Sequence, residues 1–276
     1  MTKAKLDDTG KTVFDNIYTS PDPRAYCAAM QGLDYVIPER AQPIFSDLFH
    51  TYQHYYQRPQ VNVLDLGSSY GINAALLRYA MTLPDLYARY TSDSAQALST
   101  DALLERDRQD YADIRDHANL HMTGMDISAP ALHYGRASGL LQDTVEANLE
   151  VDAPTPAQAQ SLARTDCLIS SGCFGYVTTT TLEKIIAACQ PRKPWMAHCV
   201  LRMFPLDTLS SMLQDHGYRV QIHATLVPQR RFASAEEQQE VITRLQALDI
   251  DPRGWEDQGW LYAHVITAKH DGSIPR

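Results

Sequence analysis

The sequence has no apolar run long enough to cross a bilayer, which takes about 20 consecutive apolar residues, so we expect no membrane-spanning helix. Its first residues turn acidic at Asp7 and Asp8 instead of apolar, which is not typical of a secretory signal. The five cysteines are odd in number and include no Cys-x-x-Cys pair. We therefore expect no disulfide framework, and we expect a reduced, cytoplasmic location.

Positive charge is scarce as well. The 24 lysines and arginines are outnumbered by 33 aspartates and glutamates, which gives a formal net charge of −9. Because proteins that bind nucleic acid gain much of their affinity by neutralising phosphates, this balance predicts no nucleic-acid partner. The densest basic cluster is only Gln229-Arg230-Arg231, and we expect it to be a solvated loop beside an acidic helix.

The most informative segment that is present joins an apolar run, 61–66, to an apolar helical stretch. Asp65 lies in that run, and the chain then passes through Gly67, Ser69 and Gly71. This order predicts a buried strand, a tight loop and the N-terminus of a helix. Glycines let a loop approach a ligand closely, and the free N–H groups at a helix start point at it. The segment therefore predicts a nucleotide-like cofactor at the carboxyl end of the first strand.

Strand and helix patterns alternate along the rest of the chain, which is typical of a parallel sheet covered by helices on both faces. Asp126 ends the second predicted strand, 61 positions after Asp65, whereas a minimal βαβ unit has its acid about 20 residues on. We therefore expect a helical insertion over about 82–119. A helix over 39–56 precedes the first strand, and the predicted strands cover 61–66, 120–126, 144–150, 166–171, 195–203, 218–226 and 260–268.

These elements predict a Rossmann-like α/β fold. Its seven-stranded, mostly parallel sheet has helices on both faces, an N-terminal helical cap and a helical insertion after the first helix. We divide the chain into a lid or cap segment, 1–38, and a cofactor-binding domain, 39–276, because the first segment has little periodicity and contains a turning Pro-Asp-Pro stretch. The longer helix of the insertion, 95–115, is expected to be mostly exposed.

The pattern Asp65-x-Gly67-x-Ser69-x-Gly71 resembles the first motif of class I S-adenosylmethionine (SAM)-dependent methyltransferases, with Ser69 in place of the central glycine. A dinucleotide fingerprint would need Gly-x-Gly-x-x-Gly here, and that spacing is absent. The stretches 18–26 and 33–38 look like a bacterial subgroup of the same superfamily, whose substrates are mostly unassigned. The resemblance extends over roughly residues 40–270 and implies SAM as the cofactor.

The resemblance also implies a role for residues of the loop and of the strand ends. Asp126 would bind both ribose hydroxyls, since a carboxylate accepts two hydrogen bonds at once. Ser170 and Ser171 would line the methionine and substrate side, or else only cap their strand. The other implied contacts are with the methionine part for Asp65, Gly67, Ser69 and Gly71, with the adenine face for Ile127, and with the adenine edge for Asn148 and Leu149.

Tyrosine is abundant, with 15 tyrosines against six phenylalanines. Aromatic faces attract cations such as a sulfonium, and phenol groups orient amines or carboxylates. Tyr18 and Tyr176 lie where this fold has its mouth, so both are catalytic candidates, with packing as the alternative. Arg24 is a third candidate, as a bidentate clamp for a carboxylate, and Arg202 is a similar one; a structural role is the alternative for both. His198, inside the fifth strand, is expected to be a satisfied core histidine.

Two kinds of site are disfavoured. His50-x-x-x-His54 and His117-x-x-x-His121 have the helical spacing of metal ligands, but neither has an obvious third ligand, so we expect no metal. Methyltransferases that act on the amino groups of bases and glutamine often have Asn/Asp-Pro-Pro-Tyr/Phe after the fourth strand. This chain has Ser-Ser-Gly-Cys-Phe-Gly-Tyr at 170–176 instead.

Three functions remain open from the sequence. Methyl transfer to the oxygen or nitrogen of a small molecule needs little more than alignment of the acceptor with the S–CH₃ bond. The same superfamily includes proteins in which the methionyl amine of SAM attacks its own Cγ, which gives azetidine-2-carboxylate and methylthioadenosine. In that case SAM itself is the sole substrate. A non-catalytic SAM-binding protein is the third function.

Overall fold

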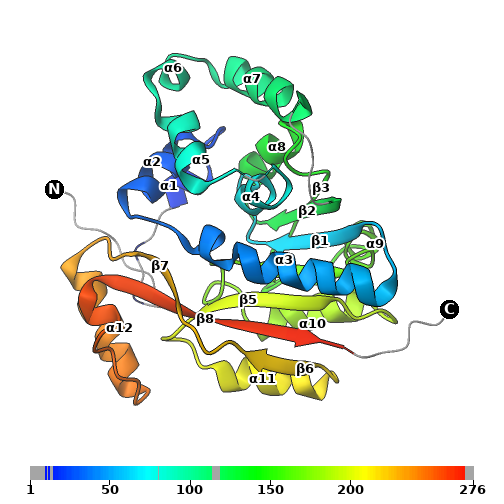
Figure 1. The fold of residues 1–276 in the computed structure, drawn as a ribbon, viewed down its shortest axis with the longest axis vertical. Coiled ribbons are helices and arrows are strands. Elements are labelled where there is room, and N and C mark those ends of the chain that lie inside the picture. The colour runs from blue at the N-terminus through cyan, green and yellow to red at the C-terminus, as the bar shows by residue number, and fades with distance from the viewer. Residues whose placement is uncertain (1–9, 11, 13–14, 80, 114–118, 271–276) are drawn as a thin grey trace.

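Strand β1 (Val61–Leu66) lies inside the sheet, with β2 (Leu120–Asp126) on one side and β4 (Cys167–Ser170) on the other (Figure 1). The computed structural model describes residues 10, 12, 15–79, 81–113 and 119–270. Within these residues the sheet has eight strands in the order β3-β2-β1-β4-β5-β8-β6, and β7 also pairs with β8. The other strands are β3 (Asp143–Glu146), β5 (Trp195–Leu201), β6 (Arg219–Ile222), β7 (Val227–Arg231) and β8 (Trp260–Lys269).

The sheet is mostly parallel, as predicted. The pairs from β3 through β5 are all parallel, whereas β8 runs against each of its neighbours β5, β6 and β7. From β1 the chain continues to β2 on one side and later enters β4 on the other, so the strand order reverses between β1 and β4. In open α/β sheets the crevice at the carboxyl ends of such a pair is where ligands bind.

The eighth strand corrects two predictions. The predicted sixth strand, 218–226, ends early, and β7 follows it along the edge of β8 opposite β5. Ala263 of β8 pairs with Leu201 of β5 on one side and with Val227 of β7 on the other. The stretch 229–231 was expected to be a solvated loop, and this is wrong, because it forms β7 with its first two side chains buried.

Helices cover both faces of the sheet because alternate residues of each strand point to opposite sides. Val63 of β1 packs in the apolar core under one layer of helices, and Leu64 packs in the core under the other. No helix in the described part of the chain is both long and apolar enough to span a bilayer. The first layer contains α3 (Ile37–Tyr56), α4 (Ile72–Tyr79) and α8 (Ala129–Ala137), and the second contains α9 (Pro156–Leu162), α10 (Thr179–Ala188) and α11 (Leu206–Asp215) (Figure 1).

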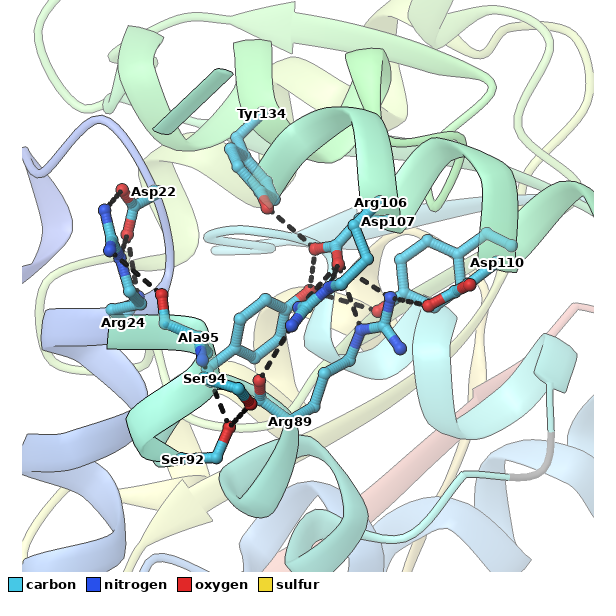
Figure 2. Close-up of polar contacts among 12 residues, drawn as sticks. Asp22, Arg24, Arg89, Ser92, Ser94, Ala95, Arg106, Asp107, Asp110 and Tyr134 are labelled. Carbon is cyan, nitrogen blue, oxygen red and sulfur yellow. Dashed lines mark hydrogen bonds and ion pairs between the residues drawn. The ribbon is translucent and has the colours of Figure 1, made fainter. Parts of the chain in front are cut away.

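The predicted helical insertion is present as α5 (Leu83–Thr91), α6 (Asp93–Gln96) and α7 (Thr100–Asp113). As expected, most side chains of its longer helix, α7, are not buried, but Asp107 on one face is fully buried. Figure 2 shows the contacts of its carboxylate. Its carboxylate accepts bonds from the guanidinium groups of Arg89 and Arg106, each at 2.7 Å, and from the hydroxyls of Tyr90 at 2.6 Å and Tyr134 at 2.7 Å. Because Tyr134 belongs to α8, this network fastens the insertion to the main domain.

The N-terminal segment forms α1 (Asp15–Tyr18) and α2 (Arg24–Gly32), and the last long helix is α12 (Ala235–Ala247), before a short 3₁₀ turn, η1 (Glu256–Gln258). Asp22 and Arg24 join the start of α2 to the insertion, and Figure 2 shows their ion pair and the bond from Arg24 to Ala95. Asp22 binds the Arg24 guanidinium at 2.7 Å and the Thr100 hydroxyl at 2.7 Å. The same guanidinium donates to the carbonyls of Ala95 at 3.2 Å and Leu98 at 2.8 Å. The start of α2 is thus attached to the insertion.

Candidate cofactor site

The loop after β1 has three residues in the left-handed region of the backbone. Gly67 has a φ of 73°, Ser69 of 48° and Gly71 of 90°. For a side chain other than glycine this conformation costs about 1 kcal/mol, which explains why a glycine is usual at the position of Ser69. Ser69 keeps the conformation because its N–H donates to Asp126 Oδ2 at 2.9 Å.

Gly67 is needed for a close crossing of two loops as well as for its turn. A Cβ on this residue would lie 2.6 Å from the Cβ of Cys173, which is on the loop after β4. The Cys173 thiol donates to the Leu66 carbonyl at 3.3 Å and so ties that loop to the end of β1. The two loops at the switch point are therefore in direct contact.

Asp126, at the end of β2, holds both the loop and the start of α8. Its Oδ2 accepts from Ser69 N, and its Oδ1 accepts from Ser128 N at 3.0 Å. Burial raises the pKa of Asp126, and the backbone bonds partly oppose this rise. Each carboxylate oxygen has a second lone pair, so two further hydrogen bonds to adjacent hydroxyls are compatible with this geometry.

Asp65 is fully buried beneath the loop, and Asn73 connects it to the end of β4. The Asn73 amide nitrogen donates to Asp65 Oδ1 at 2.8 Å and to the Ser171 hydroxyl at 3.1 Å. Asp65 Oδ2 has no hydrogen-bond partner among the described residues. Desolvation raises the pKa of Asp65 to about 7, against the effect of the Asn73 bond and with that of the nearby Asp126 charge. Asn73 was not predicted from the sequence, although its place in the first turn of α4 brings it back over β1.

The residues predicted for the adenine side gather at the same edge of the sheet. Ile127 is 71% exposed, which is unusual for an isoleucine, and with Asn148 and Leu149 it lines an open depression of about 500 Å³. The prediction that the third strand extends to Glu150 is wrong, since β3 ends at Glu146. Asn148 Oδ1 accepts from Glu150 N at 3.2 Å, and this local bond favours a turn over a longer strand.

The two serines after β4 differ in where they point. The Ser170 hydroxyl is fully buried and lies 2.9 Å from Nδ1 of His198, whereas Ser171 faces Asn73 and the loop. Burial lowers the pKa of His198 to about 3, so its ring stays neutral. His198 was expected to be satisfied, yet its Nε2 has no partner in the described part of the chain.

The N-terminal segment lies over the loop at Tyr18. The Tyr70 hydroxyl donates to the carbonyls of Ile17 at 3.0 Å and Ser20 at 2.7 Å, and the Ser128 hydroxyl donates to the carbonyl of Tyr18. The Tyr18 ring is 36% exposed, and desolvation with the Asp126 charge raises its pKa to about 12, against the effect of Arg230. Of the three residues predicted for catalysis, the structure brings Tyr18 to the loop.

Arg24 and Tyr176 are not brought to the loop in the same way. The charge of Arg24 is taken up by Asp22 and by carbonyls of the insertion, and Tyr176 is 52% exposed on the loop between β4 and α10. Arg202 donates to Glu256 at 2.5 Å, so it too serves the packing of the chain. The described residues contain no group of three side chains that could hold a metal, and His117 lies outside them.

Comparison with known proteins gives no family model and no curated protein that matches this chain. Solved structures that are similar include the plantazolicin methyltransferase BpumL in complex with SAH (13% identity, 92% of this chain and 93% of that chain, TM-score 0.43). Others are magnesium protoporphyrin IX methyltransferase of Synechocystis PCC 6803 with bound SAM (10%, 83% and 79%, TM-score 0.41) and precorrin-6y C5,15-methyltransferase of Geobacter metallireducens (15%, 77% and 81%, TM-score 0.36).

The strand order of the sheet defines the fold. That order has β8 inserted antiparallel between β5 and β6, next to a parallel β3-β2-β1-β4-β5 half. The loop after β1 and the acid at the end of β2 meet at the carboxyl edge of that half. The chain therefore has a Rossmann-like α/β fold.

Proposed function

We propose that this protein binds SAM at the carboxyl edge of β1, β2 and β4 and transfers its methyl group to the oxygen or nitrogen of a small molecule. The observation that carries the proposal is the hydrogen bond from Ser69 N to Asp126 Oδ2. It joins the glycine-bearing loop after the first strand and the acid of the second strand into one unit. A cofactor with a ribose diol next to a charged group fits such a unit.

The surrounding groups suit the other parts of SAM. The open depression beside Ile127 has an apolar wall for a flat base, together with polar groups at its rim. Asp65 suits the methionyl ammonium because its Oδ2 is unpaired and buried. A cation bound there would favour the ionised carboxylate and lower the pKa of Asp65 from about 7. SAM would thereby supply a charge partner for Asp65.

Methyl transfer breaks the S–CH₃ bond, forms a bond from carbon to the acceptor atom and releases a proton from that acceptor. Positioning supplies much of the acceleration in such a displacement. With its pKa raised to about 12, Tyr18 stays protonated near neutral pH and is suited to orient an acceptor. It is not suited to remove the proton. Tyr176 remains a prediction, and Arg24 has no part in the proposed site because Asp22 binds it.

A second function, cyclisation of SAM, is favoured by one observation. Tyr70 and Ser128 hold residues 17–20 over the loop, and such a cover suits a reaction that admits no second substrate. The methionyl nitrogen would attack Cγ, the Cγ–S bond would break, and the electron pair would leave with methylthioadenosine. The nitrogen would then lose a proton to give azetidine-2-carboxylate.

A product assay separates these functions. SAM affinity is measured first by calorimetry, and purified protein is then incubated with SAM, with and without a mixture of small phenols and amines. Methyl transfer predicts S-adenosylhomocysteine (SAH) that depends on the mixture, and cyclisation predicts methylthioadenosine from SAM alone. Asp126→Ala should remove either product, whereas Asp143→Asn, on the far end of β3, should keep it. Absence of SAM binding would overturn the proposal.

A further inference from the structure

The side chain of Gln229 is a buried polar group whose amide oxygen forms no hydrogen bond among the described residues. It belongs to β7 and is only 3% exposed. An unmade hydrogen bond at a buried polar atom costs about 1–3 kcal/mol, and most such atoms in proteins are paired. A ligand that supplies the missing bond would explain why an amide lies at this position.

The Gln229 amide lies close to Gly172, in the loop after β4, which we place at the substrate end of the proposed site. A Cβ on Gly172 would lie 2.8 Å from the Tyr35 hydroxyl and 3.4 Å from Gln229 Nε2, so two polar groups converge on this bare backbone. Gly172 is not among the residues with a positive φ, so space, and not a special turn, explains the glycine. Gly172 directly follows Ser171, which Asn73 links to Asp65.

Hydrogen bonds fix the backbone of both Gln229 and Tyr35. Val36 N donates to the Gln229 carbonyl at 2.8 Å, which pins the residue after Tyr35 to β7. On the other side, the Tyr87 hydroxyl donates to the Tyr35 carbonyl at 2.7 Å. Burial raises the pKa of Tyr35 well above its ordinary value, with an opposing effect from the Ser171 side chain, so Tyr35 keeps its proton. Pre-organised groups of this kind are typical of a recognition site.

The local charge favours a neutral ligand over an anionic one. Arg230, next to Gln229, is neutralised by Glu237 of α12 through two bonds of 2.9 and 2.7 Å. Glu237 itself is fully buried and also binds the backbone of Thr12 and Ala233, each at 2.7 Å. The positive charge beside the candidate subsite is thus already matched, and a carboxylate would have to be desolvated without a new partner.

We propose that Gln229 and Tyr35 form the subsite that recognises the methyl acceptor, and that the acceptor presents a neutral amide or an amide-like ring edge there. A glutamine amide offers an acceptor oxygen beside donor N–H groups and so pairs with a group that has the same two functions side by side. This subsite rests on the proposed methyl transfer.

The test uses benzamide, acetophenone and benzoate, three probes of similar size that differ in the polar group. Full-length ¹⁵N-labelled protein saturated with SAH is titrated with each probe, and the side-chain amide signals of Gln229 are identified by their loss in Gln229→Met. Benzamide should shift these signals and bind more tightly than the other two probes. Gln229→Met should weaken benzamide about tenfold, as expected for a lost hydrogen bond in a buried site.

The controls separate this subsite from the cofactor site and from folding. Gln229→Met should keep the SAH affinity and at least the wild-type Tm, because it removes an unpaired polar atom and keeps the side-chain volume. Gln238→Met, which removes an amide bonded to the Glu256 carbonyl, should leave benzamide binding unchanged. The subsite is refuted if no probe binds, if benzoate binds as well as benzamide, or if Gln229→Met binds benzamide within twofold of wild type. Failure of wild type to bind SAH instead refutes the proposed function.

Discussion

Replacement of Asp126 by alanine is expected to abolish SAM binding, because this carboxylate shapes the loop and, in the proposed site, would bind the ribose of SAM. Its two oxygens accept from Ser69 N at 2.9 Å and from Ser128 N at 3.0 Å. Each hydrogen bond to a charged group contributes about 1.5–3 kcal/mol. Loss of two ribose bonds alone corresponds to about 3–6 kcal/mol, so the affinity should fall at least about a hundredfold.

Asp126→Asn should have an intermediate effect, about tenfold, since an amide keeps one acceptor oxygen and turns a donor toward one of the two backbone N–H groups. The affinity of wild type should also fall in acid. Burial raises the pKa of Asp126, so the carboxylate is protonated at a higher pH than an ordinary aspartate and then stops accepting two bonds.

The measurement is calorimetric titration of SAH into wild type, Asp126→Ala and Asp126→Asn, with Tm recorded for each. Asp143→Asn is the matched control, because Asp143 lies on the neighbouring strand and binds the exposed side chains of Arg136 and Arg164. Such surface pairs contribute at most about 1 kcal/mol, so this variant should bind SAH normally. Binding by Asp126→Ala within threefold of wild type would refute the assignment of the site.

Three other variants test the loop and its cover. Gly67→Ala should lower the free energy of unfolding by about 2–4 kcal/mol in denaturant titrations, because strain at a φ of 73° adds to a 2.6 Å contact with Cys173. Gly139→Ala, with a φ of 90° and nothing within 4 Å of its Cβ, should cost only about 1–2 kcal/mol, and equal losses would contradict this reasoning. Asp65 has a folded pKa of about 7 against about 3.9 unfolded, so its contribution to stability is present below pH 4 and lost as the pH rises through 7. Asp65→Asn should flatten this part of the SAM-free stability profile, and an unchanged slope would count against the buried acid. Tyr70→Phe removes two bonds to residues 17–20 and should speed hydrogen exchange there about tenfold, unlike Tyr79→Phe, whose hydroxyl binds Gly139.

The sheet was predictable where apolar periodicity alone decides structure. The helix over 39–56 and the strand over 120–126 are confirmed, the strand with the same ends. The errors arise where side-chain hydrogen bonds override the pattern. Asn148 stops β3 through its bond to Glu150 N, and β7 was missed because Glu237 allows a basic stretch to be buried. Both partners are near in sequence, but apolar periodicity does not register side-chain hydrogen bonds.

The site was predictable in part for the same reason. Asp65 and Asp126 lie in the last two residues of β1 and β2, Ser69 lies in the loop after β1, and parallel strands bring such residues to one edge of the sheet. Arg24 was proposed for a ligand, yet its partners are carbonyls of the insertion more than 70 positions away, which no periodicity reveals. Gln229 was missed because its interest lies in a bond that is absent, and only burial shows that.

The N-terminal segment is attached to the rest of the protein at two places, at Asp22 and Arg24 and at residues 17–20. Asp22 is hydrogen-bonded to Thr100, and Arg24 is hydrogen-bonded to the carbonyls of Ala95 and Leu98. The start of α2 is therefore attached to the insertion. Residues 17–20 are held by the Tyr70 hydroxyl, which contacts the carbonyls of Ile17 and Ser20, and by the Ser128 hydroxyl, which donates to the carbonyl of Tyr18. The bonds that hold residues 17–20 over the loop therefore come from Tyr70 and Ser128, and they are separate from those that join Asp22 and Arg24 to the insertion.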